Sequence, residues 1–370
     1  RALLIFPPGI DYITSFFACL YSGTIAVPVY PPFTTKYYTQ FLSILSNSKP
    51  KFILSNTEIT KNIKPIIEKH SNFRNLIWVN PKRIFSKIEN YDFNIKINLI
   101  AFIQYTSGST SNPRGVMLSH ENLMHNLFLI HRYFCHNSNS CGVIWLPPYH
   151  DMGLIGGILQ PLYGGFPVIL MSPFDFLKKP FRWLQAITKF KATTTGGPNF
   201  SYELCLQKIS ENQLKDLDLT SWDLAFNGAE PIKPSTIENF TKKFGICGFN
   251  PKAFYPCYGL AESTLIVTGG IKNTLPTIIH VKKKELLENK VVLASDDFPG
   301  QTLTQNCISC GAPLDDNEVL IVNPESGEKC ESDRIGEIWV KSRSVALGYF
   351  DDSSSTNQTF NAYLSDTGEG

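Results

Sequence analysis

Short apolar runs that alternate with helix-period segments are the feature that most limits how this sequence can fold. Candidate strands lie at residues 51–54, 76–79, 100–105, 143–146, 168–170, 192–195, 224–226 and 253–255. Candidate helices lie between them, at residues 58–70, 120–133, 180–190, 200–209 and 234–244, with Ser119 as the N-cap of the second. This alternation is typical of parallel or mixed sheets covered by helices on both faces, so it predicts an α/β fold.

The pattern changes after about Gly269. Residues 318–322 and 335–340 are two more apolar runs, and only a turn-rich stretch separates them. Because no long helix intervenes, they predict a small antiparallel β unit near the C-terminus. The first residue is Arg1 and residues 366–370 read as a turn. We therefore expect a fragment of a longer chain, cut at both ends.

Composition excludes several classes of protein. The chain has 370 residues, 43% hydrophobic and 18% charged, which is enough for a large core and excludes global disorder. Its 34 basic and 32 acidic residues leave a net charge of +2, without the basic excess of a nucleic-acid-binding protein. The longest apolar stretch, residues 16–30, is too short and too interrupted to span a membrane. Nine cysteines are too dilute for a disulfide framework, so we expect a cytoplasmic protein.

A loop dense in hydroxyl groups and glycine follows the candidate strand at residues 100–105. It runs from Tyr105 to Gly115 and contains five Ser or Thr residues between them and one cation, Arg114. Backbone N–H groups, hydroxyls and a positive charge together suit a polyphosphate. The loop lacks the spacing of an ordinary P-loop. By itself it is better read as a flexible surface loop, and both interpretations stay open on these residues alone.

Three motifs in order along the chain identify a family. Tyr105–Gly115, Asn227–Pro231 and Tyr258–Thr264 together resemble the ANL superfamily of adenylate-forming enzymes. More narrowly, the chain resembles a fatty acyl-AMP ligase, and the segments that carry this resemblance are Leu146–Leu154, Gly196–Phe200, Gly336–Val340 and Ser344–Tyr349. The resemblance implies the large N-terminal domain of such an enzyme. It divides the chain into ATP- and acyl-binding subdomains at residues 1–268, a ligase-specific insertion at 269–311 and an antiparallel β subdomain at 312–370.

The resemblance also implies which residues hold the nucleotide. Those expected around the triphosphate are Thr106, Ser107, Gly108, Ser109, Thr110 and Gly115. Those expected around the adenine and the acyl pocket are Asn227, Gly228, Ala229, Glu230, Tyr258, Gly259, Leu260 and Ala261, with Tyr258 stacked on the base. Arg114 stands where the family often has Lys, which keeps the charge but changes the geometry of its contacts.

Glu262, Thr106 and His150 are the catalytic candidates. By resemblance, Glu262 and Thr106 hold the Mg²⁺ that bridges the triphosphate, and His150 stands at the mouth of the acyl tunnel. The acyl side of the pocket would further include Asp151, Met152, Gly153, Asn199 and Phe200, and the paired Gly156 and Gly157 could leave a channel open beside the following helix. Simpler interpretations exist, since a Glu at a helix start is often only favourable dipole chemistry and a lone His is more often structural.

The resemblance implies ATP-dependent activation of a fatty acid to an acyl-adenylate, with transfer of the acyl group to an acyl carrier protein. Two alternatives remain, a fatty acyl-CoA synthetase and a non-catalytic nucleotide-binding module. The family continues beyond Gly370 into a ribose-binding motif and a mobile C-terminal domain. We therefore expect this fragment to be only weakly active by itself.

Overall fold

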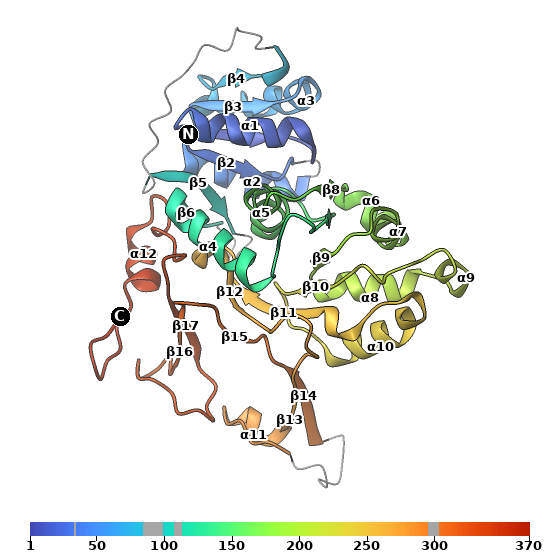
Figure 1. Cartoon of the computed structure of the whole chain (residues 1–370). Coiled ribbons are helices and arrows are strands. Elements are labelled where there is room, and N and C mark those ends of the chain that lie inside the picture. Colours follow the sequence, from blue (N-terminus) through green and yellow to red (C-terminus); the bar gives the residue numbers. More distant parts are fainter. Residues whose placement is uncertain (33–34, 84–98, 107–112, 295–302) are drawn as a thin grey trace. The chain divides into compact units, whose positions relative to one another are not determined.

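The computed structural model describes residues 1–32, 35–83, 99–106, 113–294 and 303–370 (Figure 1). These residues form two compact units. Unit 1 comprises residues 1–124, 147–151 and 346–360, and unit 2 comprises residues 125–146, 152–345 and 361–370. Within the described ranges, no helix has both the length and the apolar character needed to cross a membrane.

A six-stranded sheet forms the centre of unit 1, in the order β4-β3-β1-β2-β5-β6. Neighbouring strands from β4 to β5 are parallel, and β6 pairs with β5 in the antiparallel sense. The strands are β1 (Ala2–Ile5), β2 (Ala26–Val29), β3 (Phe52–Ser55), β4 (Ile77–Val79), β5 (Ile100–Tyr105) and β6 (Gly115–Ser119). The predicted mixed sheet is therefore confirmed here.

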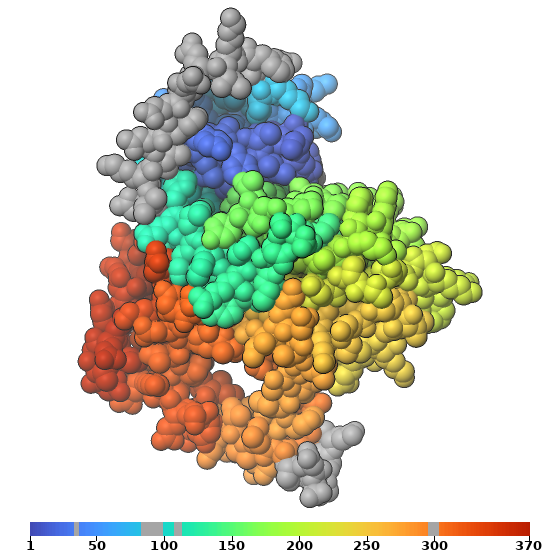
Figure 2. Space-filling view, viewed as in Figure 1, coloured from blue at the N-terminus to red at the C-terminus, as the bar shows by residue number. Residues whose placement is uncertain are grey.

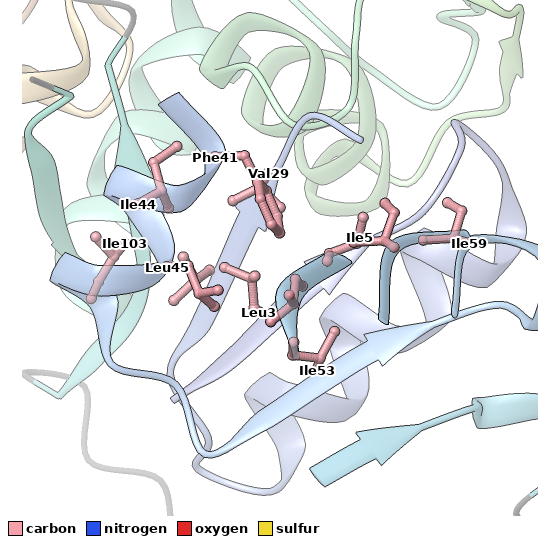
Figure 3. Close-up of a cluster of buried hydrophobic side chains, with 12 residues drawn as sticks. Leu3, Ile5, Val29, Phe41, Ile44, Leu45, Ile53, Ile59 and Ile103 are labelled. Atoms are coloured by element: carbon pink, nitrogen blue, oxygen red, sulfur yellow. The ribbon is translucent and has the colours of Figure 1, made fainter. Parts of the chain in front are cut away.

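Helices cover both faces of this sheet. The helices of unit 1 are α1 (Ile10–Tyr21), α2 (Thr35–Ser48), α3 (Thr57–Ile67) and α12 (Ser353–Phe360). On one face, Leu3 and Ile5 of β1 join a buried cluster with side chains of α2 and α3 (Figure 3). On the other face, Phe16 of α1 packs against Phe102 of β5, with ring centroids 5.5 Å apart. All four residues of β1 are consequently buried, which explains its uninterrupted apolar sequence.

A seven-stranded sheet forms the centre of unit 2, in the order β15-β12-β11-β10-β9-β7-β8. Its strands are β7 (Gly142–Ile144), β8 (Val168–Leu170), β9 (Thr194–Gly197), β10 (Leu224–Asn227), β11 (Phe254–Gly259), β12 (Ile266–Gly269) and β15 (Ala312–Pro313). Neighbours from β8 to β11 are parallel, whereas β12 and β15 add an antiparallel edge. The sequence did not indicate that β15 would pair with this sheet.

Large aromatic side chains fill the core of unit 2. Trp183 and Trp222 are fully buried, with ring centroids 5.3 Å apart, and Tyr202 contacts both rings. The helices of unit 2 include α5 (Gln160–Gly164), α6 (Pro173–Lys178), α7 (Phe181–Phe190), α8 (Asn199–Lys208), α9 (Glu211–Leu214) and α10 (Pro234–Phe244). Aromatic pairs of this kind contribute packing specificity beyond the apolar area that they bury.

Two antiparallel strand pairs lie in the later part of unit 2. β16 (Glu318–Val322) pairs with β17 (Glu337–Lys341), which confirms the predicted β unit. β13 (Ile278–Lys282) pairs with β14 (Thr304–Ile308), and the short helix α11 (Lys283–Leu287) follows β13. In the space-filling view the orange residues of this second pair project from the rest of unit 2 (Figure 2). The expected division of the chain at residues 268 and 311 stays a prediction.

Most predicted helices and strands occur within a few residues of their expected ends. The helix α4 (His120–Tyr133) begins after Ser119 as predicted, because the Asn122 N–H donates to Ser119 Oγ (3.1 Å) and the Ser119 N–H donates to Asn122 Oδ1 (3.0 Å). The apolar segment after His150 differs from expectation, since Met152–Leu159 forms a π-helix. Such segments are rare and often occur at functional sites.

The expectation of an open channel is wrong at Gly157. A Cβ atom there would lie 2.6 Å from Ile144 Cγ2, so the π-helix packs directly against β7 at this residue. Gly156 is less crowded, with Leu265 Cδ2 at 3.4 Å from the corresponding position. Glycine at 157 therefore permits close packing instead of leaving space for a ligand.

Candidate functional site

The carboxyl ends of β9, β10 and β11 meet at one edge of the sheet in unit 2. The three strands are adjacent and parallel, and Asn227 is in register with Gly197 on one side and Pro256 on the other. In open α/β sheets the crevice beyond the carboxyl ends of the strands is the usual ligand site. This edge brings together three of the segments singled out from the sequence, which begin at Gly196, Asn227 and Tyr258.

Asn227 ends β10 with a buried side-chain amide. The residue is fully buried, and neither its Nδ2 nor its Oδ1 atom has a hydrogen-bond partner among the described residues. Leaving such a group unpaired costs about 1–3 kcal/mol, so it marks a place where a polar partner would be favourable. The next residue, Gly228, has a packing role, because a Cβ atom there would lie 2.9 Å from the Cys257 carbonyl oxygen.

Hydrogen bonds connect the turn after β10 to the start of α8. Glu230 Oε1 accepts a hydrogen bond of 2.6 Å from the Phe200 N–H, which satisfies one free donor at the helix N-terminus. Asn199 is buried, and its Oδ1 accepts from the Lys233 N–H at 3.2 Å. Phe200 remains 40% exposed and meets the Trp145 ring edge-on. Hence Glu230 and Asn199 connect the turn after β10 with the start of α8.

Glu262 lies in the connection between β11 and β12. This connection contains the short 3-10 turn Ala261–Ser263, and the strand pairing shifts register between Tyr258 and Gly259. Tyr258 is partly buried, and this burial together with the nearby Glu262 carboxylate raises the pKa of its phenol. The predicted adenine-stacking residue and the predicted metal ligand therefore lie close enough to interact electrostatically.

In unit 1 the ends of the hydroxyl-rich loop are joined. The Thr106 N–H donates to the Arg114 carbonyl oxygen at 3.1 Å, and Tyr105 pairs with Gly115 across β5 and β6. A Cβ atom at Gly115 would lie 2.8 Å from Ile103 Cγ2, so this glycine is needed for packing. The Arg114 guanidinium lies 5.1 Å from the centroid of the Tyr349 ring. Ser107, Gly108, Ser109 and Thr110 lie outside the described residues.

His150 and Asp151 form an ion pair in unit 1. His150 Nδ1 lies 2.5 Å from Asp151 Oδ1, and the His150 side chain is 54% exposed whereas that of Asp151 is 13% exposed. Burial of the imidazole lowers its pKa, but the Asp151 carboxylate outweighs this effect and raises the pKa of His150 overall. In unit 2, Met152 and Gly153 begin the π-helix, and Gly153 is buried.

We expect the substitution Asp151→Asn to lower the pKa of His150. Because the folded pKa is raised above the ordinary value of 6.5, the pair stabilises the fold fully below pH 6.5, and this contribution disappears as the pH rises through the folded pKa. NMR titration of histidine-labelled protein measures the shift, with His150→Gln to assign the resonance. Asp175→Asn is the matched control, since Asp175 pairs with Arg182 and not with a histidine. A titration of His150 that is identical in Asp151→Asn and wild type would contradict the prediction.

Two buried polar residues at these segments were missed in the sequence. Gln104 of β5 donates from Nε2 to the Tyr149 carbonyl oxygen at 3.0 Å, which ties that strand to the segment carrying His150. Asn126 of α4 donates to backbone carbonyls on either side of Thr264. Both are polar residues at positions where the strand or helix pattern places apolar ones. That signal could have indicated buried hydrogen bonds but not their partners.

The chain is similar to known proteins over most of its length. A model of the AMP-binding enzyme family matches residues 1–350. Medium-chain-fatty-acid–[acyl-carrier-protein] ligases of Moorena producens and Teredinibacter turnerae are 39% and 37% identical to the chain, over 100% and 94% of its length. The alignments cover 63% and 60% of these relatives, so the chain spans about six tenths of their length.

A solved structure is also similar over nearly the whole chain. It is a fatty acyl-adenylate ligase from Legionella pneumophila in complex with acyl adenylate and pyrophosphate, 42% identical with a TM-score of 0.87. The match covers 96% of this chain and 61% of that one. This similarity confirms the predicted fold.

Proposed function

We propose that this chain, which belongs to the family of AMP-binding enzymes, is the part of a fatty acyl-AMP ligase that binds ATP and a fatty acid. The observation that carries the proposal is the shared edge of the sheet in unit 2, where the segments that begin at Gly196, Asn227 and Tyr258 lie at the carboxyl ends of three adjacent parallel strands. The similarity to a ligase solved with acyl adenylate and pyrophosphate supports the same assignment. The activity proposed is that of the whole protein.

The reaction joins a carboxylate to the α-phosphate of ATP. A carboxylate oxygen of the fatty acid forms a bond to the α-phosphorus, the bond from that phosphorus to the oxygen bridging to the β-phosphate breaks, and pyrophosphate leaves. Because the barrier to phosphoryl and nucleotidyl transfer is dominated by positioning and charge, the protein has to hold both substrates in line and balance the negative charge. We assign this work to Thr106 and the hydroxyl-rich loop after it, and to Glu262.

We propose that a magnesium ion is shared between the protein and the substrate. Among the residues that the structure describes, no group of three or more His, Cys, Asp or Glu side chains could hold a metal. Mg²⁺ in nucleotide enzymes usually has one or two protein oxygen ligands and takes the others from phosphates and water. Glu262 and Thr106 would supply such oxygens. When bound, Mg²⁺ would neutralise charge on the phosphates.

The other candidate residues take binding roles in this proposal. Tyr258, with Gly259, Leu260 and Ala261 beside it, would contact the adenine, and the turn Asn227–Glu230 would line the nucleotide and acyl pocket. His150 and Asp151 would stand at the entrance for the fatty acid, with Met152, Gly153, Asn199 and Phe200 along the acyl side. Phe200 is the most exposed apolar side chain of this set, so it is the most accessible to an acyl chain.

We further propose that the acyl group passes to the phosphopantetheine thiol of an acyl carrier protein. The similarity to two ligases whose names specify that acceptor supports this choice. Residues 269–311, which include the β13–β14 pair, are the segment that we assign to acceptor choice. We place the protein in the cytoplasm, because all nine cysteines of the chain are free thiols.

One experiment separates the possible functions. Full-length protein is incubated with ATP, Mg²⁺ and fatty acids of increasing length, and ATP–pyrophosphate exchange is measured together with mass spectrometry of the adenylates. We expect exchange that depends on the fatty acid. Added carrier protein or CoA then identifies the acceptor: faster loading of CoA would favour an acyl-CoA synthetase. Absence of exchange with every acid would favour a non-catalytic nucleotide-binding module.

A further inference from the structure

The backbone two residues after Glu262 adopts a strained conformation. Thr264 has φ 69° and ψ −62°, and the Leu265 N–H donates to the Ser263 carbonyl oxygen at 2.8 Å, which together define a γ-turn. A β-branched residue at positive φ is a genuine outlier, and such strain costs about 1–3 kcal/mol. Strain of this size persists only where the surrounding structure holds it in place.

A buried amide holds both sides of this turn. Asn126 is fully buried, and its Nδ2 donates to the carbonyl oxygens of Ser263 (3.3 Å) and Ile266 (3.0 Å). Its Oδ1 accepts from the Ile266 N–H at 3.2 Å. Asn126 therefore pairs with both backbone groups of Ile266, as a neighbouring strand would, and reaches across the turn to the residue next to Glu262.

The segment around Ser344 also binds both Thr264 and Asn126. The buried Thr264 hydroxyl donates to the Ser344 carbonyl oxygen at 2.6 Å, and Asn126 Nδ2 also lies 3.1 Å from Ser344 Oγ. Ser344 Oγ in turn lies 2.8 Å from His125 Nδ1, and His125 Nε2 lies 3.0 Å from Asp316 Oδ1. With the proton on Nε2, His125 donates to Asp316 and accepts from Ser344, so each of these side chains has a hydrogen-bond partner.

We propose that Asn126 is a positioning residue, which holds the γ-turn at Thr264 and thereby fixes where the Glu262 carboxylate lies. The proposal rests on the proposed function and deepens it. Loss of the amide would leave the Ile266 N–H and two carbonyl oxygens without this partner, and the strained turn would relax. Because Ser263 is bonded directly to Glu262, relaxation there moves the Glu262 backbone. Asn126 itself is assigned no contact with substrate.

The test compares two buried asparagines that bind the same strand. Asn317 Nδ2 donates to the Val267 carbonyl oxygen at 2.9 Å. Asn317→Ala therefore removes a side-chain hydrogen bond to β12 but none to residues 263–266. In full-length protein we expect Asn126→Ala and Asn317→Ala both to lower the thermal unfolding temperature. Only Asn126→Ala should raise the Mg²⁺ concentration for half-maximal ATP–pyrophosphate exchange, by about 10–100-fold, the effect of removing a group that orients a metal ligand.

Two readouts that do not depend on turnover accompany the exchange assay. The rise in unfolding temperature that ATP produces with Mg²⁺ should shrink in Asn126→Ala, whereas calorimetric affinity for a non-hydrolysable acyl-adenylate mimic without Mg²⁺ should match wild type. Wild-type Mg²⁺ dependence in Asn126→Ala would overturn the inference and leave the proposed function intact. Absence of exchange in the wild type would instead refute the proposed function.

A second pair of variants covers the case in which Asn126→Ala does not fold. Thr264→Gly keeps access to the positive φ but removes the hydroxyl that binds Ser344, so the turn is no longer held on that side. Thr264→Ser keeps the hydroxyl. We expect Thr264→Gly to raise the Mg²⁺ concentration for half-maximal exchange and Thr264→Ser to keep the wild-type value. Equal Mg²⁺ dependence in both variants and wild type would contradict the proposal.

Discussion

Full-length protein carrying Glu262→Gln is expected to lose nearly all ATP–pyrophosphate exchange while keeping its fold. Glutamine preserves the size of the side chain but removes the negative charge that a divalent cation would need. Loss of one charged ligand next to a reacting phosphate raises the barrier by several kcal/mol, and about 3–4 kcal/mol corresponds to a hundred- to thousandfold slower reaction. Exchange measured at saturating ATP and fatty acid reports this loss directly.

The matched control removes a carboxylate elsewhere in unit 2. Glu238 is exposed on α10, so Glu238→Gln should leave exchange unchanged. Thermal unfolding of both variants should match wild type, and both should bind an acyl-adenylate mimic in the absence of Mg²⁺. Near-normal exchange in Glu262→Gln would refute the metal-binding role of this residue, whereas a lowered unfolding temperature would point to a structural role.

The architecture could be predicted largely from local pattern. Strands buried on both faces, such as β5 and β10, produce apolar runs that are visible without any knowledge of the partner strands. β1 is equally apolar and buried but was not among the predicted strands. β9 shows the limit of this signal, because residues 192–195 were expected and Thr194–Gly197 is found. Gly196 and Gly197 carry no apolar side chain, yet a Cβ atom at Gly196 would lie 2.1 Å from the Phe226 carbonyl oxygen. Glycine is required there by close packing, which the strand pattern cannot reveal.

The candidate site could be predicted from the sequence only in part. Motif resemblance identified Glu262 and its neighbours, and the parallel order of β9, β10 and β11 explains why these segments share an edge. The hydrogen bonds that fix the Glu262 loop join residues 137 and 140 positions apart in the sequence. No periodicity encodes partners at such distances. For the same reason the pairing of β15 with β12 could not be foreseen.

The second large effect is expected at Gly259, where the chain passes from β11 into the Glu262 loop. A Cβ atom at this residue would lie 1.7 Å from the Leu265 carbonyl oxygen, far inside contact distance, and this oxygen belongs to the backbone, so it cannot turn aside as a flexible side chain could. Gly259→Ala therefore has to shift the pairing of β11 with β12, where the register already changes. Such overpacking typically lowers the free energy of unfolding by about 1–3 kcal/mol. A lower denaturant midpoint with an unchanged slope measures this loss.

Gly259→Ala should also reduce exchange more than its stability loss explains, because Leu265 is the residue whose N–H closes the γ-turn next to Glu262. Pushing Leu265 away opens that turn and displaces the carboxylate, so folded molecules would still be impaired. Gly245→Ala is the matched control: Gly245 has negative φ, and a Cβ atom there meets no atom within 4 Å. We expect that control to retain wild-type stability and exchange. If Gly259→Ala kept wild-type exchange at temperatures where it is fully folded, the position of the Glu262 loop would not limit adenylate formation.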